Sequence, residues 1–288
     1  MNAPRVFAAA GLLSLAFVMV SCNRPAADAM TARRGETEPL SNAPNIALPE
    51  PRPLKEMPVS TSSAEALTRF QQARRYRHDF IKLSECERLL RQAVALDPDF
   101  ALAHAYLSLN YSTLGKNAES EASMQRAVAL SVHAGEGERM FIAALKEGPT
   151  AIASWEQLTR MYPEDKYIHL ILGYLYKNTA QNYPMALREF QQVLALDGTL
   201  GNAYNMIGYT YMAMEQFDKA EEALRTYAGL FPEAGNPHDS LGDLYLKMGR
   251  YAEAVQEFEM ACRLEPDMKW SCEKAQENRK KALGNSRD

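Results

Sequence analysis

The sequence predicts an all-α solenoid of about six helical hairpins followed by a capping helix at the C-terminus. Two repeated patterns support this prediction. Six times, a large apolar residue stands eight positions before the end of a helical stretch, and a second apolar residue stands two positions before the same end. Four times, Leu or Ile is followed by a small residue and then by Tyr three positions further on, with 34 or 35 residues between neighbouring copies. A fixed period of this length is typical of stacked helical hairpins.

The first pattern marks the second helix of each predicted hairpin. Its large residues are Leu90, Met124, Trp155, Phe190, Leu224 and Phe258, and the residues nearer the helix end are Leu96, Leu130, Met161, Leu196, Leu230 and Leu264. The other pattern marks the first helix. Its small residues are Ser108, Gly173, Gly208 and Gly242, which precede Tyr111, Tyr176, Tyr211 and Tyr245. A small residue lets two paired helices approach closely.

Residues 1–22 have the composition of an export signal. A single basic residue, Arg5, precedes an uncharged apolar run from Val6 to Val20, and this run is too short to cross a bilayer comfortably. The run is followed by Ser21 and Cys22. This ending resembles a lipobox, the motif at which bacterial lipoprotein signals are cleaved so that the cysteine is lipidated. Cys22 is therefore the predicted lipidation site, with an uncleaved anchor or an ordinary secretory signal as the alternative.

The residue after the cysteine indicates the membrane at which a bacterial lipoprotein is anchored. Many Gram-negative lipoproteins that stay at the inner membrane have Asp there, whereas this chain has Asn23. The resemblance implies a bacterial envelope protein that is lipid-anchored at the outer membrane and faces the periplasm.

Residues 23–63 are predicted to form a disordered, proline-rich tether. They contain seven prolines, five basic and five acidic residues, and no aromatic residue. Such a segment buries too little apolar area to offset the entropy cost of ordering the chain. We therefore expect the folded body to begin at residue 64.

Residues 64–283 form the predicted solenoid domain, and residues 284–288 a flexible tail. The two patterns resemble the tetratricopeptide repeat family, whose unit pairs a helix bearing Leu-Gly and Tyr with a helix bearing Ala, an aromatic residue and Pro. Units 201–234 and 235–268 match nearly throughout. The unit at 132–165 matches less well, because it has lost residues near its centre. The resemblance implies a right-handed superhelix in which each hairpin packs on its neighbours.

The last unit of such an array needs a polar cap. Residues 269–283 are rich in Glu, Lys and Arg, and we expect them to form a final helix with one face in water. Trp270 and Ala275 are the residues expected to cover the end of the apolar core.

Charge argues against nucleic acid as a partner. Since the signal carries +1, the tether 0 and residues 269–288 +3, the total of −4 leaves −8 for residues 64–268. Nucleic acids and anionic lipid surfaces are bound mainly through clustered Lys and Arg. We expect a protein or peptide partner, and membrane attachment only through the N-terminal lipid.

Histidine and cysteine are the residues most able to carry chemistry in this chain. His104, His169 and His238 occupy one repeat position, which predicts packing within each hairpin and not a metal site. Cys262 and Cys272 are ten residues apart and could form a disulfide, which the sequence alone leaves open. No phosphate-binding loop, nucleophile motif or zinc motif occurs in the sequence, so we expect no catalytic residue, metal or cofactor.

The family resemblance implies a concave groove, lined by the second, fifth, ninth, twelfth and thirteenth residues of each unit. Carried over, these positions give Leu102, Ala105 and Leu109, then Tyr167, Leu170, Tyr174, Lys177 and Asn178, then Asn202, Asn205, Tyr209 and Met212, and finally Asn236, Asp239, Asp243 and Lys247. Asn and Tyr suit an extended peptide with a few apolar anchors. The alternative is that these side chains merely solvate the helices.

The function expected from these features is an envelope-anchored scaffold that binds a partner protein or extended peptide in the groove, in the assembly of a pilus, a secretion system or outer-membrane machinery. A small-ligand-binding or enzymatic lipoprotein built on the same solenoid is the alternative. A purely structural subunit of a larger complex is a third reading. The sequence does not identify the partner.

Overall fold

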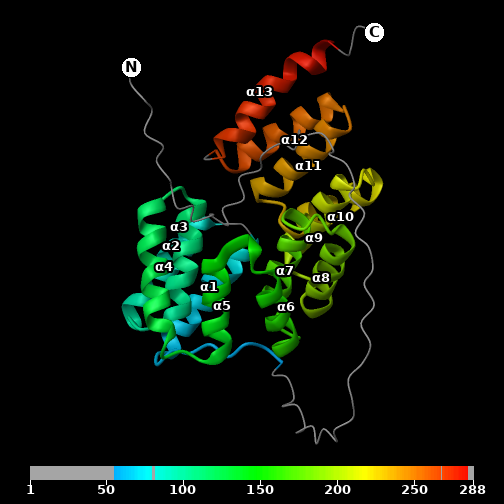
Figure 1. Ribbon diagram of the computed structural model, residues 1–288. Coiled ribbons are helices and arrows are strands. Elements are labelled where there is room, and N and C mark those ends of the chain that lie inside the picture. The colour runs from blue at the N-terminus through cyan, green and yellow to red at the C-terminus, as the bar shows by residue number, and fades with distance from the viewer. Residues whose placement is uncertain (1–54, 80–81, 267, 285–288) are drawn as a thin grey trace, which may run out of the picture.

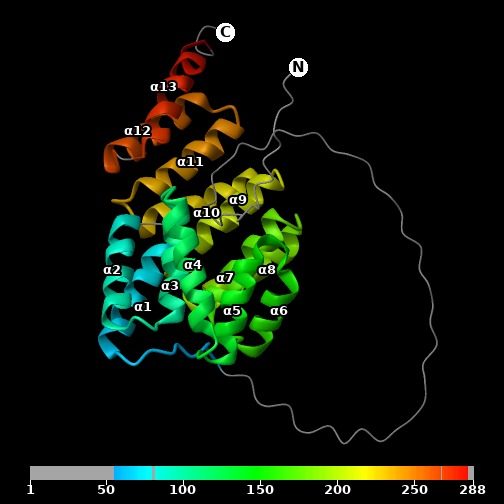
Figure 2. The ribbon, with the colours of Figure 1, turned by 60° about the vertical axis from the view of Figure 1, so that its left-hand side comes forward.

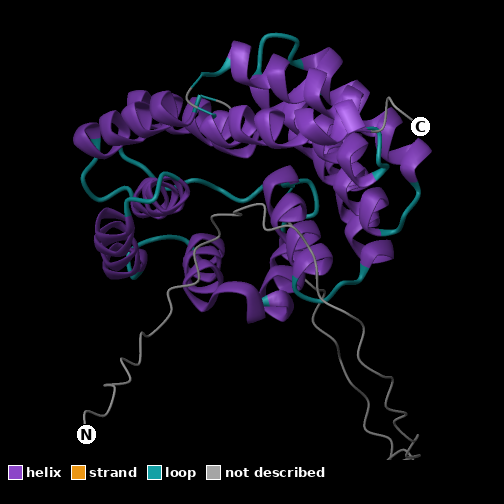
Figure 3. Cartoon of the chain, turned by 90° about the horizontal axis from the view of Figure 1, so that it is seen from above, coloured by secondary structure: helices purple, strands orange, loops and turns teal. Residues whose placement is uncertain are grey.

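The computed structural model describes residues 55–79, 82–266 and 268–284, and these residues form thirteen α-helices and one short 3₁₀ turn, with no strand among them (Figures 1 and 3). The helices are α1 (Ala64–Asp79), α2 (Leu83–Leu96), α3 (Ala101–Thr113), α4 (Asn117–Ser131), α5 (Glu136–Glu147), α6 (Ile152–Met161), α7 (Lys166–Asn178), α8 (Tyr183–Leu196), α9 (Gly201–Ala213), α10 (Phe217–Leu230), α11 (Gly235–Lys247), α12 (Tyr251–Leu264) and α13 (Lys269–Gly284). The predicted all-α solenoid of six hairpins and a cap is confirmed.

The repeated small residues lie where each first helix crosses its partner. A Cβ atom at Gly208 would stand 2.6 Å from Cγ and Cδ2 of Leu224, on the second helix of the same hairpin. Gly173 and Phe190, and likewise Gly242 and Phe258, are related in the same way. The two repeated patterns therefore meet in space, and glycine is favoured at these three positions because an added Cβ atom would press against the facing side chain.

The repeated tyrosines close the turns between the paired helices. The backbone N–H of Arg250 donates to the carbonyl oxygen of Tyr245 at 2.8 Å, and the second and fifth hairpins have the same bond. Before this bond the chain passes through one residue of positive φ, which is Gly249 here and Glu215 in the fifth hairpin. The bond satisfies a carbonyl group that the end of the helix leaves without an intrahelical partner.

The third hairpin is the short one, as the sequence predicts. Helices α5 and α6 have 12 and 10 residues, whereas the paired helices of the other hairpins have 13 to 16. A 3₁₀ turn at Gly148–Thr150 joins α5 to α6, and Gly148 has a φ of 80°. The irregular part of this unit thus lies at its centre, where the two helices are joined.

The array coils back on itself. Helix α1 contacts α2 and α3, as neighbouring elements do, but it also contacts α9 of the fifth hairpin. One hydrophobic cluster of buried residues runs from Met57 to Ala223 and includes side chains from the first five hairpins. The concave side of this part of the array is therefore interior.

Residues 55–63 are ordered against the body, which differs from the predicted boundary of the tether. Figures 1 and 2 show this blue segment running along the lower ends of the first hairpins. Met57 is buried and its backbone N–H donates to Asp165 Oδ2, and the N–H of Ser60 donates to Glu138 Oε1 at 2.9 Å. Asp97 accepts from Thr61 and Ser62. Three carboxylates near the starts of successive hairpins thus bind Met57, Ser60, Thr61 and Ser62, in a segment that composition alone assigned to the tether. The rest of the predicted tether, the signal with Cys22, and residues 285–288 lie outside the described residues.

Helix α13 closes the C-terminal end and covers α12. Cys262 of α12 and Cys272 of α13 form a disulfide with Cα atoms 5.2 Å apart. Ala275 is buried as expected, but Trp270 is 51% exposed, so the expectation for Trp270 was wrong. Among the described helices, none combines the length and apolar character needed to cross a membrane.

Candidate functional site

The predicted groove residues are much less accessible than a solvated groove would make them. Tyr167, Leu170, Asn202, Asn205, Met212 and Asp239 are buried, and Tyr174, Lys177, Asn178, Tyr209, Asn236 and Asp243 are half-buried. Leu102, Ala105 and Leu109 of the second hairpin are buried too, and only Lys247 is exposed. The groove residues divide into a covered part and an open part.

The last turn of α1 covers part of the groove through ionic contacts. Arg75 pairs with Asp79 one turn later on the same helix, and its Nη1 donates to Asp197 Oδ2 at 2.8 Å. The same guanidinium donates to the carbonyl oxygen of Thr199. Asp79 in turn accepts from the backbone N–H of Asn202 at 3.5 Å, in the first turn of α9.

Aromatic side chains complete this contact. His78 stacks on Tyr167 with ring centroids 4.4 Å apart, and the guanidinium of Arg74 lies 4.3 Å from the centre of the same ring. His78 Nε2 is 3.0 Å from the hydroxyl of Tyr106, and Tyr227 donates its hydroxyl to the carbonyl oxygen of Asp79. We call the residues that α1 contacts here, Tyr167, Asp197, Thr199, Asn202 and Tyr227, the closure surface.

Burial governs the protonation of the groups in this contact. Burial lowers the pKa of His78 well below its usual value of 6.5, and the neighbouring positive charges of Arg77, Arg74 and Arg75 lower it further. Burial also raises the pKa of Asp79, although Arg75 opposes that shift. Partial burial by itself would raise the pKa of Asp197. Hydrogen bonds from Thr199 and Lys166 lower it, and the net shift is downward.

The open part of the groove is a polar strip along four helices, which we define as Lys177, Asn178, Tyr209, Asp243 and Lys274. Tyr209 on α9 donates its hydroxyl to Asp243 Oδ2 on α11 at 2.9 Å. Lys274 on α13 donates to the other oxygen of Asp243 at 2.7 Å and also pairs with Asp239. At the other end the Lys177 ammonium lies 5.8 Å from the centre of the Tyr209 ring and donates to Asn178.

The polar strip is hydrogen-bonded but not sealed. Burial raises the pKa of Tyr209 well above 10 and the adjacent Asp243 adds to this rise, so the phenol remains a donor at neutral pH. Burial also raises the pKa of Asp243, while Lys274 opposes the shift. The strip therefore offers a partner half-buried apolar ring area with donors and acceptors at its edges.

The other candidates take structural positions. His169 Nδ1 pairs with Glu189 at 2.6 Å and His238 Nδ1 with Glu257 at 2.7 Å, each across its own hairpin as predicted. Cys86 is buried, and burial raises the pKa of its thiol to about 12. The described residues hold no group of three or more potential metal ligands.

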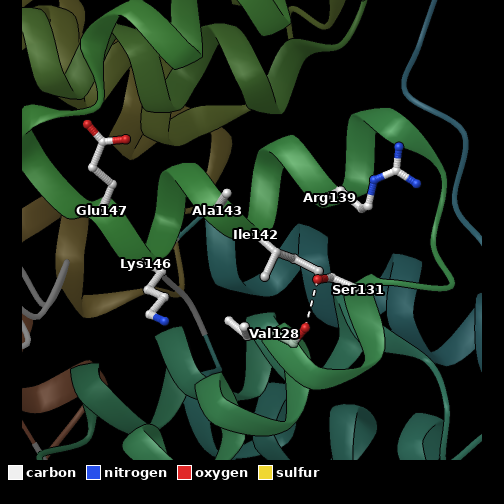
Figure 4. A pocket seen from close by; sticks show the side chains of 7 residues that line it. All are labelled: Val128, Ser131, Arg139, Ile142, Ala143, Lys146 and Glu147. Atoms are coloured by element: carbon white, nitrogen blue, oxygen red, sulfur yellow. Dashed lines mark hydrogen bonds between the residues drawn. The ribbon is translucent and has the colours of Figure 1, made fainter.

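Sequence reasoning did not find the depression between α4 and α5, which has a volume of about 420 Å³. Figure 4 shows Ile142 of α5 pointing toward Val128 of α4, while Arg139 and Glu147 extend from the other side of α5. Ser131 at its rim donates to the carbonyl oxygen of Val128. The depression is lined by apolar residues of both helices and by Ser131, Arg139, Lys146 and Glu147, and no repeat position in the sequence predicts it.

Comparison with known proteins points to one repeat family. The model of the tetratricopeptide repeat family matches residues 205–269. Protein bimA of Emericella nidulans is 30% identical over 86 residues, which are 30% of this chain and 11% of that protein. Anaphase-promoting complex subunit 3 of Schizosaccharomyces pombe is 22% identical over 185 residues, or 63% of this chain and 28% of that one. This chain thus spans less than a third of either relative.

A solved structure extends the likeness in fold to about three quarters of the chain. The crystal structure of the APC/C hetero-tetramer Cut9-Hcn1 superposes with a TM-score of 0.52 at 17% identity, over 74% of this chain and 43% of that one. The family model matches the last two hairpins, and Gly173 and Tyr176 of the fourth hairpin repeat the same two positions. Residues 205–269 are therefore identified as tetratricopeptide repeats.

Proposed function

We propose that this chain is a scaffold of the bacterial envelope that docks a partner protein on its polar strip. The observation that carries the proposal is the strip itself, where a half-buried tyrosine, an amide and paired charges remain accessible on successive first helices. Half-buried Tyr beside hydrogen-bonding groups is the composition of many protein interfaces. Two similar proteins are named as, or belong to, parts of a multi-protein complex, which supports partner binding as the role.

Envelope anchoring is the second part of the proposal. It rests on the export signal at residues 1–22 and on Cys22 at the end of its apolar run. A lipid on that cysteine would hold the body at the outer membrane on the periplasmic side, because several acyl chains bind a bilayer almost irreversibly. Assembly of an envelope complex is the process we propose the scaffold serves, without catalysis or a cofactor.

Site-specific photo-cross-linking tests the docking surface. A photo-reactive amino acid at Asn178, inside the strip, is compared in cells of the native host with the same amino acid at Gln125, an exposed position on α4. The proposal expects a discrete adduct from position 178 that is weakened several-fold by Tyr209→Phe, which removes one hydroxyl and keeps the ring. Equal adducts from both positions, or an adduct indifferent to Tyr209→Phe with unchanged helicity, would reject the strip as the docking surface.

Anchoring is tested independently by labelling cells with an alkyne-bearing fatty acid. The wild-type chain should take up the label and fractionate with the outer membrane, and Cys22→Ser should abolish both. Label that persists in Cys22→Ser, or wild-type chain without label, rejects the lipid anchor and leaves the docking proposal untouched.

A further inference from the structure

We propose that the closure by α1 is reversible, and that the closure surface binds a helix end of a partner protein that carries an arginine and, one turn later, a carboxylate. This inference rests on the proposed function as a protein scaffold, and it names the class of partner segment. The segment would take the place of the last turn of α1.

The chemistry of the surface is read from what α1 places on it. The Arg75 guanidinium is held by the Asp197 carboxylate, by the carbonyl oxygen of Thr199 and, at 3.2 Å, by the Thr199 hydroxyl. A planar guanidinium satisfies several acceptors at once, which a lysine ammonium does with less geometric fit. The surface therefore selects arginine at this point.

The carboxylate requirement comes from the start of α9. The residue before this helix is Leu200, whose side chain makes no capping hydrogen bond, whereas Asp165 caps α7 with bonds to two backbone N–H groups. Asp79 supplies the missing acceptor, since it binds the N–H of Asn202. The partial positive charge at a helix N-terminus favours an anion. The start of α9 thus binds a carboxylate, and in this structure that carboxylate is Asp79, from a distant part of the chain.

The polar character of the contact supports reversibility. Asp79 is 1% exposed and His78 is 8% exposed, so closure takes charged and polar groups out of water. Desolvating such groups offsets much of what their pairing gains, whereas apolar groups of the same size would hold the contact more firmly. Contacts of this composition within a chain resemble transient interfaces.

The geometry of the array also allows opening. Each hairpin of a solenoid is stabilised mainly by its neighbours, so the terminal hairpin can move without unfolding the others. Moving α1 away would expose Tyr167, Asn202 and Asn205, which the family pattern places in the groove. Asn205 is 4% exposed and its Oδ1 has no hydrogen-bond partner among the described residues, so opening would present a ready acceptor.

The test uses the full chain and a fluorescent peptide with the sequence of residues 64–79. Arg75→Gln with Asp79→Asn in the protein removes the ionic contacts and keeps the side-chain sizes. This variant should bind the peptide at least about tenfold more tightly than the wild-type chain, by fluorescence anisotropy. A peptide carrying the same two replacements should bind neither protein. Equal affinity of the wild-type and variant chains for the native peptide overturns the inference, as does absence of binding to the variant.

A distance measurement guards against a variant that is merely misfolded. Spin labels at Gln72 on α1 and Thr226 on α10, both exposed, report the separation of the first and fifth hairpins. The inference expects a longer and broader distance distribution in the variant at wild-type helicity, and the single replacement Arg75→Gln serves if the double variant loses helicity. An unchanged distance overturns reversible closure. It does not affect the docking proposal, which cross-linking from Asn178 tests separately.

Discussion

Replacing Gly208 by alanine should destabilise the protein, although alanine is the better helix former. The new Cβ would lie 2.6 Å from two carbon atoms of Leu224, whereas carbon atoms in contact prefer about 3.5–4.0 Å. Leu224 is fully buried and cannot turn into solvent to relieve the clash. Overpacking of this kind costs about 1–3 kcal/mol. Against this, alanine returns about 1 kcal/mol of helix propensity, so we expect a net loss of about 1 kcal/mol.

Urea unfolding followed by circular dichroism measures this loss, and Gly229→Ala is the matched control. Gly229 lies on α10, where an added Cβ atom would meet no neighbouring atom within 4 Å, so the same replacement should stabilise there by up to about 1 kcal/mol. In a Leu224→Ala background, itself destabilised by about 2–5 kcal/mol, Gly208→Ala should become neutral or stabilising. The packing argument fails if Gly208→Ala stabilises the wild-type chain as much as Gly229→Ala does.

Three further outcomes follow from the contacts described. Replacing Cys262 and Cys272 by serine should lower the free energy of unfolding by roughly 2–3 kcal/mol, and thiol counting on unreduced wild-type protein should find neither cysteine reactive. The free energy of unfolding should fall as the pH drops below about 6.5, because the pKa of His78 is lowered in the folded state and the unfolded state gains the proton first. His78→Gln should flatten that part of the curve of stability against pH. A variant curve parallel to that of the wild-type chain would contradict this. Met57→Ala should cost about 2–5 kcal/mol in thermal or urea unfolding, whereas a freely moving tether would make it neutral.

The fold could be predicted because the repeat fixes local packing. Gly208 and Leu224 are sixteen positions apart in one hairpin, and the pairs Gly173–Phe190 and Gly242–Phe258, seventeen and sixteen positions apart, bring a small residue against a large one in the same way. The tyrosine patterns and the loss of residues near Gly148 likewise depend on neighbours in the sequence, so periodicity alone locates them. The cap was predicted from polarity, but the exposure of Trp270 was not, because the sequence does not show which side of the last helix meets α12.

The closure and the ordered segment before α1 depend on contacts between distant residues. Arg75 and Asp197 are 122 positions apart, and Met57 and Asp165 are 108 apart. No repeat unit contains either pair, so the repeat carries no information about them. Composition was also misleading for residues 55–63, since a proline and a run of small polar residues suggest disorder while Asp97, Glu138 and Asp165 bind the backbone N–H groups of that segment.

The groove positions nevertheless contained a signal of which part would be covered. In the second hairpin they are Leu102, Ala105 and Leu109. These residues are apolar, which is not expected of a solvent-exposed groove, and all three are buried. In the sixth hairpin they are polar or charged and end at the exposed Lys247. Apolar residues that face the axis of a solenoid must be covered by something, because exposed apolar area is costly. The shift from apolar to polar along the chain therefore indicates an axis that is filled in the early hairpins and open toward α11 and α13. For this reason we place the docking surface on the polar strip, and we expect Tyr167 and Asn202 to become accessible only when α1 moves.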